Sequence, residues 1–385
     1  TLHPPFSIQH SEFLPPAPLK MHRLEEYHQQ WTAKLLDERN SEGGWHGELS
    51  SSAVSTATAV VALQCFDAQG NGALIRNGRR WLAGTQLSDG GWGDSPESPA
   101  NTTATLLARA ALHGVPEFTE NSRRADAFLE REFTGMDAGS LRAGILHKYG
   151  SDRTFSVPIL ALCAAVGLLG EGTQAWQGIP RLPFELAVMP GGLLRLLKLQ
   201  VVSYAIPALI CVGIAQHRNR KPGLATWLRE RLVPRCLRIL QQKQPDSGGF
   251  LEAAPLTAFC LICLSISGLK AHPVADACAE FLCRTVRSDG SWPIDTNLDQ
   301  WLTSLAGKAV AESLADAEKA SLSELIMGRQ FREVHPFTGA RPGGWGWTPL
   351  SGAVPEADDT AAALIVLHQL RKGVCSPEIE RGCRW

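Results

Sequence analysis

A turn that recurs along the chain constrains its fold more than any other feature. The clearest copy, WLAGTQLSDGGWGDSPESPANTTATLLARAAL from Trp81, ends an apolar segment at a Gln, turns through Asp-Gly-Gly-Trp and resumes in a segment rich in Thr, Ala and Leu. A degenerate copy surrounds Tyr149. Similar turns carry the aromatic residues Trp45, Trp92, Phe250, Trp292 and Trp345. A unit that recurs at roughly 45-residue spacing is typical of a repeat architecture built from one supersecondary element.

The parts of this unit predict two helices joined by a turn. The paired glycines allow a sharp reversal after the first helix. We expect the Gln side chain to cap the free N–H groups of the next helix and the Trp to cover the junction. Asn101, Thr102, Thr103 and Ser55 are suitable residues for starting the helix that follows. The sequence therefore predicts an all-α fold of helical hairpin repeats, which either closes into an α/α (toroid) barrel or stays an open solenoid.

Composition excludes one class of partner and indicates the state of the cysteines. The 385 residues contain 37 Lys and Arg against 38 Asp and Glu, for a formal charge of −1. This balance offers no basic face to nucleic acid, which we do not expect as a partner. Of the 10 cysteines, several lie inside apolar segments: Cys65, Cys163, Cys211, Cys260 and Cys263. This distribution indicates buried, reduced thiols of a cytosolic protein rather than disulfides.

The last copy of the turn runs into a cluster of acidic residues. It reads GGWGW from Gly343 and then PEADDTA from Pro355, which places Glu356, Asp358 and Asp359 directly before an apolar segment. Acidic residues in the first turn of a helix interact favourably with its dipole, by about 0.3–1 kcal/mol each. Taken alone, the cluster therefore has a structural interpretation as a helix start. Clustered carboxylates also raise one another's pKa, which suits an acid that must keep its proton.

The turns and the acidic segment together resemble a known family. The Gln…Asp-Gly-Gly-Trp units are similar to the QW motifs of the squalene–hopene cyclase family, the class II terpene cyclases. Members of that family follow a Gly-Gly-aromatic turn with Pro-Asp-x-Asp-Asp-Thr-Ala at the start of a helix. The last unit matches this pattern except that Glu356 stands at the first Asp. The resemblance extends from about residue 30 onward and implies the α/α barrel fold of that family.

The resemblance implies an isomerase that cyclises a linear polyprene, with squalene as the first candidate and a hopanoid-type product. By their positions in the motif, Asp358 protonates a terminal C=C bond, Asp359 is its neighbour and Glu356 replaces the first Asp. The carbocation that forms needs a dry cavity, and aromatic faces stabilise it. Trp347 and Trp301 match aromatic residues of that cavity, although core packing is an equal alternative for Trp301. No cofactor and no metal are implied.

The position of the acidic segment predicts an arm and two barrels. Residues 1–29 would form an N-terminal arm, 30–300 a first α/α barrel, and 301–385 the start of the catalytic α/α barrel. In relatives the motif is followed by further repeats, so we expect 301–385 to be an incomplete barrel. A missing C-terminal part or a second chain would complete it, and a homo-oligomer is compatible with this arrangement. On this view the chain alone would not cyclise squalene.

One apolar stretch, residues 176–214, predicts contact with a membrane. It is interrupted by prolines, glycines, Arg195 and Lys198, and no apolar run reaches the roughly 18 residues of a spanning helix. A helix that lies in the membrane interface, with its cations at the surface, is expected instead. With the resemblance, this implies a peripheral, monotopic protein on the cytoplasmic face of a membrane. The alternative is a buried helix pair inside the barrel.

Two other functions compete with the cyclase. A protein prenyltransferase β-subunit has a similar barrel with a zinc site, and Asp276 with Cys278 mimics its Asp-x-Cys ligand pair. At the position of that family's zinc-binding His, however, this chain has Asp359, and His368 lies more than two turns further on. A third zinc ligand is therefore lacking, and zinc is not expected. The second alternative is a non-catalytic isoprenoid-binding or scaffold protein on the same repeat.

Overall fold

The computed structural model describes residues 21–189, 206–223, 226–336 and 338–385. Within these residues every named element is a helix, as the sequence predicts. The first helices are α1 (Met21–Asp37), α2 (Ala53–Asp67), α3 (Gly72–Gly84), α4 (Thr102–Ala111), η1 (Pro116–Phe118), α5 (Thr119–Leu129), α6 (Ala138–Tyr149), α7 (Arg153–Ala165), α8 (Gly172–Ala175) and η2 (Phe184–Val188). The others are α10 (Ile206–Arg218), α11 (Thr226–Lys243), η4 (Phe250–Glu252), α12 (Ala254–Ile266), α13 (Pro273–Arg284), α14 (Asp299–Val310), α15 (Asp316–Gly328), α16 (Ala357–Leu370) and α17 (Pro377–Arg384).

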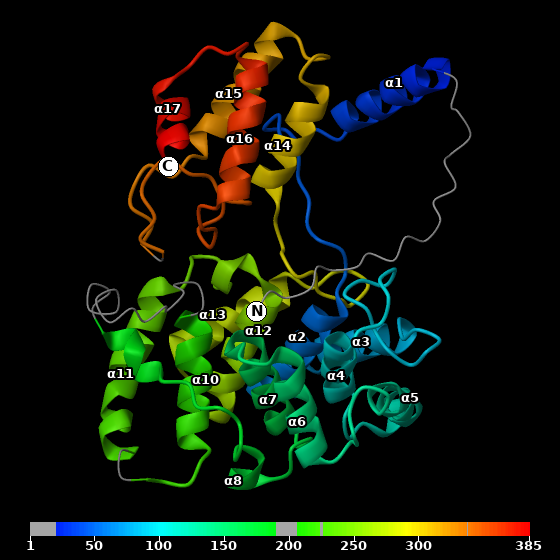
Figure 1. Ribbon diagram of the computed structural model, residues 1–385, viewed down its shortest axis with the longest axis vertical. Coiled ribbons are helices and arrows are strands. Elements are labelled where there is room, and N and C mark those ends of the chain that lie inside the picture. The colour runs from blue at the N-terminus through cyan, green and yellow to red at the C-terminus, as the bar shows by residue number, and fades with distance from the viewer. Residues whose placement is uncertain (1–20, 190–205, 224–225, 337) are drawn as a thin grey trace, which may run out of the picture.

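The helices from α2 to α13 form an α/α barrel, called here the first barrel (Figure 1). In its inner ring α2 contacts α4, α4 contacts α7, α7 contacts α10, α10 contacts α12, and α12 returns to α2. The helices α3, α5, α6, α11 and α13 each pack outside one of these inner helices. An inner helix must be apolar around most of its circumference. In α2, accordingly, every side chain from Ser55 to Leu63 is buried.

The remaining helices form a smaller second body, in the upper part of Figure 1. Here α16 packs against α14, α15 and α17, and α1 packs against α14. The apolar cluster of this body is separate from that of the first barrel and contains both Trp45 and Trp345. Trp45, which lies within the range 30–300 expected for the first barrel, therefore packs with helices that follow residue 300. Of the expected arm, residues 1–20 lie outside the described residues, and those from 21 onward begin α1.

The recurring turn has the same pair of hydrogen bonds in each tryptophan copy. In the clearest copy, the indole N–H of Trp92 donates to the carbonyl of Leu82 (2.8 Å), at the end of the preceding helix. The backbone N–H of Trp92 donates to Oγ1 of Thr105 (3.0 Å), in the helix that follows. The same pair joins Trp45 to Leu35 and Thr303, Trp292 to Leu282 and Thr56, and Trp345 to Ile326 and Thr360. The tryptophan thus covers the helix junction, as expected.

The Gln of the turn does not cap helix N–H groups, so this expectation was wrong. Gln86 Nε2 instead donates to the carbonyls of Gly90 (2.8 Å) and Asn121 (3.0 Å), which joins the turn to the first turn of α5. Capping is left to Asn101, whose Oδ1 accepts the N–H of Ala104 (2.9 Å). The same two-carbonyl contact joins Gln244 to Gly248 and Val274, and Gln330 to Gly343 and Glu378.

Two connections run between the first barrel and the second body, one from α1 to α2 and the other from α13 to α14. The Trp45 turn precedes α2, but its backbone N–H donates to Thr303 of α14 (3.1 Å). The Trp292 turn precedes α14, but its backbone N–H donates to Thr56 of α2 (3.0 Å). Each turn is therefore completed by the helix that follows the other turn. The two connections run antiparallel where they meet, in a bridge between residues 51 and 293.

Of the expected membrane stretch, the structure describes 176–189, most of which is half-buried or exposed, and 206–214, which lies inside the molecule. Trp176 and Phe184 are buried. Residues 206–214 belong to α10 of the inner ring, where Ile210 and Ile214 are fully buried between α7 and α12. The alternative of a buried helix is therefore correct for residues 206–214. Residues 190–205 lie outside the described residues, and contact of the stretch with a membrane stays a prediction. No helix in the described part of the chain is long and apolar enough to cross a membrane.

Candidate active site

The acidic segment begins α16 because the Trp345 turn places it there. The N–H of Glu356 donates to the carbonyl of Trp345 (2.9 Å), and the N–H of Trp345 donates to Oγ1 of Thr360 (2.9 Å). Glu356 occupies the N-cap position in extended backbone, yet its side chain makes no capping hydrogen bond. Asp358 Oδ1 accepts the N–H of Asp359 (3.0 Å). The helix-start interpretation therefore accounts for Asp358 but not for Glu356.

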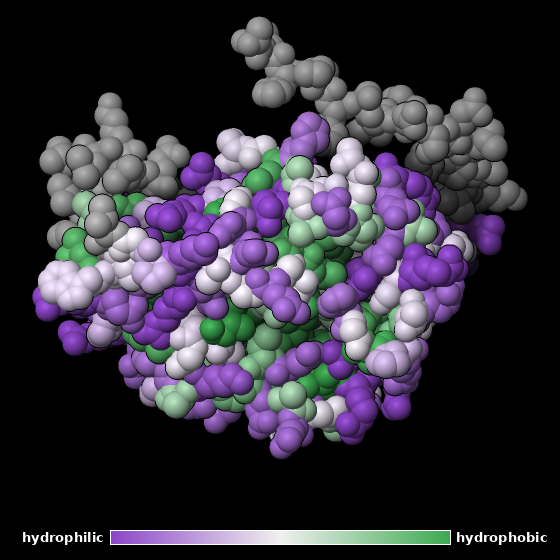
Figure 2. Space-filling model, turned by 90° about the horizontal axis from the view of Figure 1, so that it is seen from below, coloured by the Kyte–Doolittle hydropathy of each residue, from purple (hydrophilic) through white to green (hydrophobic). Residues whose placement is uncertain are grey.

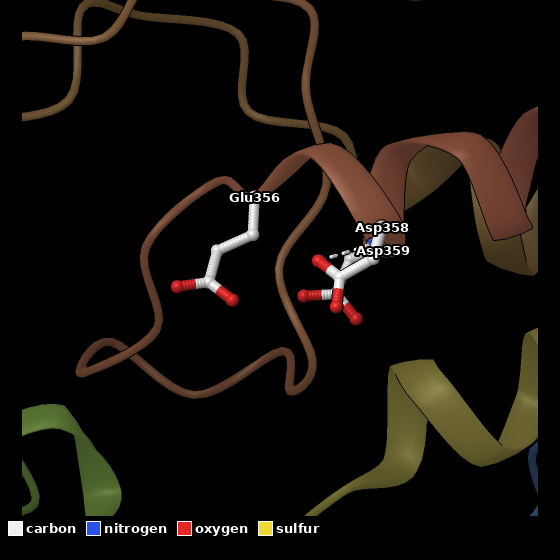
Figure 3. Close-up of side chains that lie close together, drawn as sticks. All are labelled: Glu356, Asp358 and Asp359. Atoms are coloured by element: carbon white, nitrogen blue, oxygen red, sulfur yellow. Dashed lines mark hydrogen bonds between the residues drawn. The ribbon is translucent and has the colours of Figure 1, made fainter. Parts of the chain in front are cut away.

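The three carboxyl groups converge, as Figure 3 shows. One oxygen from each of Glu356, Asp358 and Asp359 lies within 4.8 Å of the other two. Glu356 extends from the loop that precedes α16, and both aspartates come from the first turn of the helix. Asp359 is only 3% exposed, whereas Glu356 and Asp358 are exposed. The structure thus brings together the three acids selected from the sequence, but it buries Asp359 rather than Asp358, which the resemblance makes the proton donor.

Burial and mutual repulsion raise pKa values in this cluster. The pKa of Asp359 is raised to about 7, by burial first and then by the charges of Asp358 and Glu356. The pKa of Glu356 is also raised, by burial first and then by the charges of Asp358 and Asp295. Like charges this close cannot all ionise without a large cost. The cluster therefore retains a proton near neutral pH.

A fourth carboxyl, Asp295, acts on the cluster and was not selected from the sequence. It lies on the connection between the first barrel and α14, where it pairs with Ala253 in an isolated bridge. Burial raises its pKa to about 6. Asp295 comes near Glu356 because its connection runs from the first barrel to the second body. No local pattern in the sequence signals this arrangement.

The two aromatic candidates meet at the start of α14. The carbonyl of Trp347 accepts the backbone N–H groups of both Gln300 and Trp301, each at 3.0 Å. Both tryptophan side chains are partly buried. The indole Nε1 of Trp347 is buried and has no hydrogen-bond partner within the described residues. The backbone contact joins the two segments that carry these tryptophans, and the part of their side chains in a cavity wall stays a prediction.

Glu252 of the first barrel holds the loop that leads to the acids. Its Oε1 accepts the N–H of Gly352 (3.0 Å) and the hydroxyl of Ser247 (2.7 Å). A side chain at Gly352 would overlap this carboxyl group. Glu252 and its neighbour Leu251 have φ values of +52° and +57°. This left-handed conformation costs of the order of 1–3 kcal/mol and persists only where the surrounding contacts hold it in place. We therefore identify Glu252 as a residue that positions the loop, and the sequence analysis did not select it.

The zinc ligands of the prenyltransferase alternative are not assembled. Asp276 is exposed, whereas Cys278 is buried, and burial raises the pKa of its thiol well above the usual range. The Cys278 sulfur accepts a hydrogen bond from Gln244 Nε2 (3.5 Å). His368 belongs to α16, in the second body. Within the described residues, the His, Cys, Asp and Glu side chains close enough to share one ion are the three acids of the cluster, whose oxygens suit a hard cation.

Comparison with known proteins supports the resemblance. Residues 29–136 match the squalene-hopene cyclase N-terminal domain. The chain is 23% identical over 359 residues to enfumafungin synthase of Hormonema carpetanum, an alignment that covers 75% of this chain and 26% of that protein. It is 23% identical over 391 residues to the squalene–hopene cyclase of Alicyclobacillus acidocaldarius, covering 88% and 58%. The chain therefore spans between about a quarter and three fifths of the length of these relatives.

Solved structures of a type II terpene cyclase, MstE from Scytonema, also match. The apo form has 17% sequence identity and a TM-score of 0.28, and the match covers 71% of this chain and 82% of that one. A variant of the same enzyme, solved with geranylgeranyl dihydroxybenzoate as substrate, gives a TM-score of 0.28 as well. The sequence matches confirm that the chain is similar to the squalene–hopene cyclase family and, more broadly, to the type II terpene cyclases.

Proposed function

We propose, on the premise of this similarity, that the chain carries the acid of a class II terpene cyclase. The enzyme would protonate the terminal C=C bond of a linear polyprene, squalene in the first place, and guide the resulting carbocation to a hopanoid-type product. In the first step an O–H bond of a carboxylic acid breaks and a C–H bond forms. The carboxylate is left behind, and the positive charge passes to the substrate.

The observation that carries this proposal is the convergence of three carboxyls around a buried acid that keeps its proton. An alkene is a very weak base, so the donor must be protonated at neutral pH and its conjugate base must be stabilised. The pKa of about 7 at Asp359 meets the first need. The N-terminal end of α16 supports the second, because the helix dipole favours negative charge there. The dipole of α16 would by itself lower the pKa of an acid at this end, yet the pKa of Asp359 is raised. Capping of the helix alone does not explain this arrangement.

The roles within the cluster follow from position and environment. Asp358 occupies the middle position of the motif and is the proposed donor. Asp359 and Glu356 make ionisation of the whole cluster costly, so that the group shares a proton rather than releasing it. Trp347 and Trp301 are proposed to face the carbocation, each contributing about 0.5–2 kcal/mol through its ring face.

The setting of the reaction is proposed from the substrate class. A squalene-like polyprene dissolves in a bilayer rather than in water, so we propose peripheral, monotopic association with the cytoplasmic face of a membrane. The part of the apolar stretch that precedes α10, residues 176–205 with Arg195 and Lys198 among its leucines, is the candidate contact. A second chain or a second copy is proposed to complete the cavity over the acids.

The test uses the protein as its host produces it, with any chains that copurify. Squalene is supplied in detergent micelles, and the extracted products are analysed by gas chromatography and mass spectrometry. We expect a cyclic triterpene from the wild type and at least about 100-fold less from Asp358→Asn, since the group that transfers the proton is removed. Glu312→Gln is the matched control, because Glu312 is exposed on the second body and makes no hydrogen bond within the described residues.

The outcomes distinguish the identity of the proton donor from the proposal that the acid cluster supplies the proton. Full product formation by Asp358→Asn, with loss in Asp359→Asn, would transfer the donor role to Asp359. Full product formation by both variants would reject the acid cluster as the proton source. Cyclisation of a geranylgeranyl chain but not of squalene would keep the chemistry and change the substrate.

A further inference from the structure

A basic cavity lies at the end of the first barrel that faces away from the second body, at the lower edge of Figure 1. Its volume is about 110 Å³, several times what a single water needs. It opens where α10 ends and α11 begins. Figure 2 views the molecule from this end, where hydrophilic side chains cover most of the face and apolar groups are exposed between them. Four cationic side chains line the cavity: Arg181, Arg220, Lys221 and Arg229.

Buried contacts fix the chain that carries the first of these cations. Gln216 of α10 is 3% exposed, and its amide contacts the backbone on both sides of Arg181. Its Oε1 accepts the N–H of Leu182 (2.9 Å), and its Nε2 donates to the carbonyl of Pro180 (2.8 Å). The backbone at Arg181 is therefore held in place beside the cavity although its side chain is exposed.

Two guanidinium groups are also fixed before any ligand arrives. Arg220 donates to the carbonyls of Trp176 (3.0 Å) and Ile179. Arg229 stacks over the ring of Phe184, with its Cζ 4.8 Å from the ring centre. The Nε of Arg229 is buried and has no hydrogen-bond partner within the described residues. A ligand in this cavity would therefore meet guanidinium groups that are already ordered, so that binding loses little side-chain entropy.

The positive charge at this site is only partly balanced. Glu185 pairs with Arg229 (3.0 Å), and Glu230 pairs with His217 and Arg218. Within the described residues, Arg181, Arg220 and Lys221 have no carboxylate partner. Burial lowers the pKa of Arg220 first, and the charges of Arg181 and Arg229 lower it further. Like charges held this close are unfavourable, and an anion between them would remove the repulsion.

We propose that this cavity binds a phosphate group. Guanidinium groups match phosphate oxygens with paired hydrogen bonds, and Lys221 adds a mobile point charge. The cavity is also lined by Gly223 and Thr226, at the N-terminal end of the 18-residue helix α11, where the helix dipole favours an anion. The proposal does not depend on the cyclase function, because none of its residues belongs to the acid cluster.

The phosphate has two potential sources with the same chemistry, a phospholipid headgroup and a free phosphate or diphosphate. Arg181 lies within the apolar stretch 176–214, which connects the cavity to the part of the sequence expected at a membrane. A headgroup would fix the barrel against an anionic bilayer. A free phosphate would instead be a soluble ligand of the barrel end.

The first experiment measures inorganic phosphate binding to the 385-residue chain by isothermal titration calorimetry. The test variant is Arg181→Gln with Lys221→Gln, two exposed side chains that make no hydrogen bond within the described residues, so the fold is kept. The matched control is Arg76→Gln with Lys308→Gln, which removes the same charge from other exposed sites. We expect the test variant to bind phosphate at least 10-fold more weakly and the control to bind it like the wild type.

The second experiment separates the sources by cosedimentation with vesicles. Phosphatidylcholine vesicles are compared with vesicles that also contain phosphatidylglycerol. Binding that requires the anionic lipid, weakens in the test variant and is displaced by phosphate supports the headgroup. Calorimetric binding that depends on Arg181 and Lys221, without a difference between vesicles, supports free phosphate. Equal behaviour of test variant and control in both experiments, or no binding in either, overturns the proposal.

Discussion

The turns at Trp92 and Trp345 share their backbone hydrogen bonds but differ in the first helical turn that follows. Trp92 pairs with Asn101 in an isolated antiparallel bridge, and Trp345 pairs with Glu356 in a bridge of the same kind. Asn101 and Glu356 therefore occupy equivalent positions. Asn101 caps its helix with a side-chain hydrogen bond, whereas Glu356 makes none. Three residues later the first barrel has Ala104 and the second body has Asp359. The same scaffold thus caps a helix in one place and assembles a proton-holding acid cluster in the other.

This comparison shows why burial dominates the pKa of Asp359. Ala104 is completely buried, and Asp359 is 3% exposed. The repeat therefore provides a buried position at this point whether the residue is apolar or acidic. A carboxyl placed there loses its hydration, and two neighbouring acids add repulsion.

The largest expected effect comes from moving an acid to the equivalent position in the first barrel. Ala104→Asp should lower the free energy of unfolding by about 3–5 kcal/mol at pH 8, because it buries a charge without a partner. Thr103→Asp, at the position equivalent to Asp358, is the matched control and should cost less. Urea denaturation at pH 8 and pH 5 measures both variants. A cost below about 1 kcal/mol for Ala104→Asp would show that the buried position is not what raises the pKa of Asp359.

Removing the buried acid from the second body, by Asp359→Asn, should stabilise that body. The pKa of Asp359 is raised from 3.8 to about 7. The folded state therefore binds a proton that the unfolded state releases, and stability falls as pH rises from about 4 to about 7. At pH 8 we expect Asp359→Asn to raise the free energy of unfolding by about 2–4 kcal/mol. At pH 4 the gain should vanish. Equal effects at both pH values, measured by urea denaturation, would contradict the raised pKa.

The loops of the two turns also differ in what holds them. In the first barrel, the side chains of the loop bond to one another, as in the contact between Ser95 and Ser98 (2.9 Å). In the second body, Glu252 holds the loop through Gly352 (3.0 Å). Glu252→Ala should cost about 2 kcal/mol and raise hydrogen exchange at residues 346–355. Exchange at 93–100 serves as the internal control. Unchanged exchange at 346–355 would remove Glu252 as a positioning residue.

The smallest expected difference concerns the N-cap positions themselves. Asn101→Ala should lower the free energy of unfolding by about 1 kcal/mol, because a capping hydrogen bond is lost. Glu356→Ala should leave stability at pH 8 unchanged or slightly raised, since this side chain caps nothing and its carboxyl is repelled by Asp358. Thermal or urea unfolding of the two variants checks this. A similar loss in both would return Glu356 to a capping role.

The sequence predicts what each repeat does locally and misses how the repeats connect. The helix pairing and the tryptophan over each junction follow from the recurring Gly and Trp, and Glu356, Asp358 and Asp359 follow from one short motif. The contacts of the Gln side chain were predicted wrongly. The crossing of the connections does not follow from the sequence, because every tryptophan copy of the turn offers a backbone N–H to the same kind of threonine. Asp295 acts on the cluster from the connection between the two bodies, and Glu252 acts from the first barrel. Residues 206–214 of α10 resemble a membrane contact in sequence because an inner helix of a barrel is equally apolar.

The measurement that tests the central claim most directly is the pKa of the Asp359 carboxyl. The chain is prepared with ¹³C-labelled aspartate, and the carboxyl resonance of Asp359 is assigned by its absence from Asp359→Asn. Its chemical shift is then followed from pH 3 to pH 9. A midpoint near the value of about 7 would confirm an acid that keeps its proton near neutral pH. A midpoint near the ordinary value of 3.8 would contradict the account, because Asp359 would then be ionised at neutral pH and would hold no proton for the cluster.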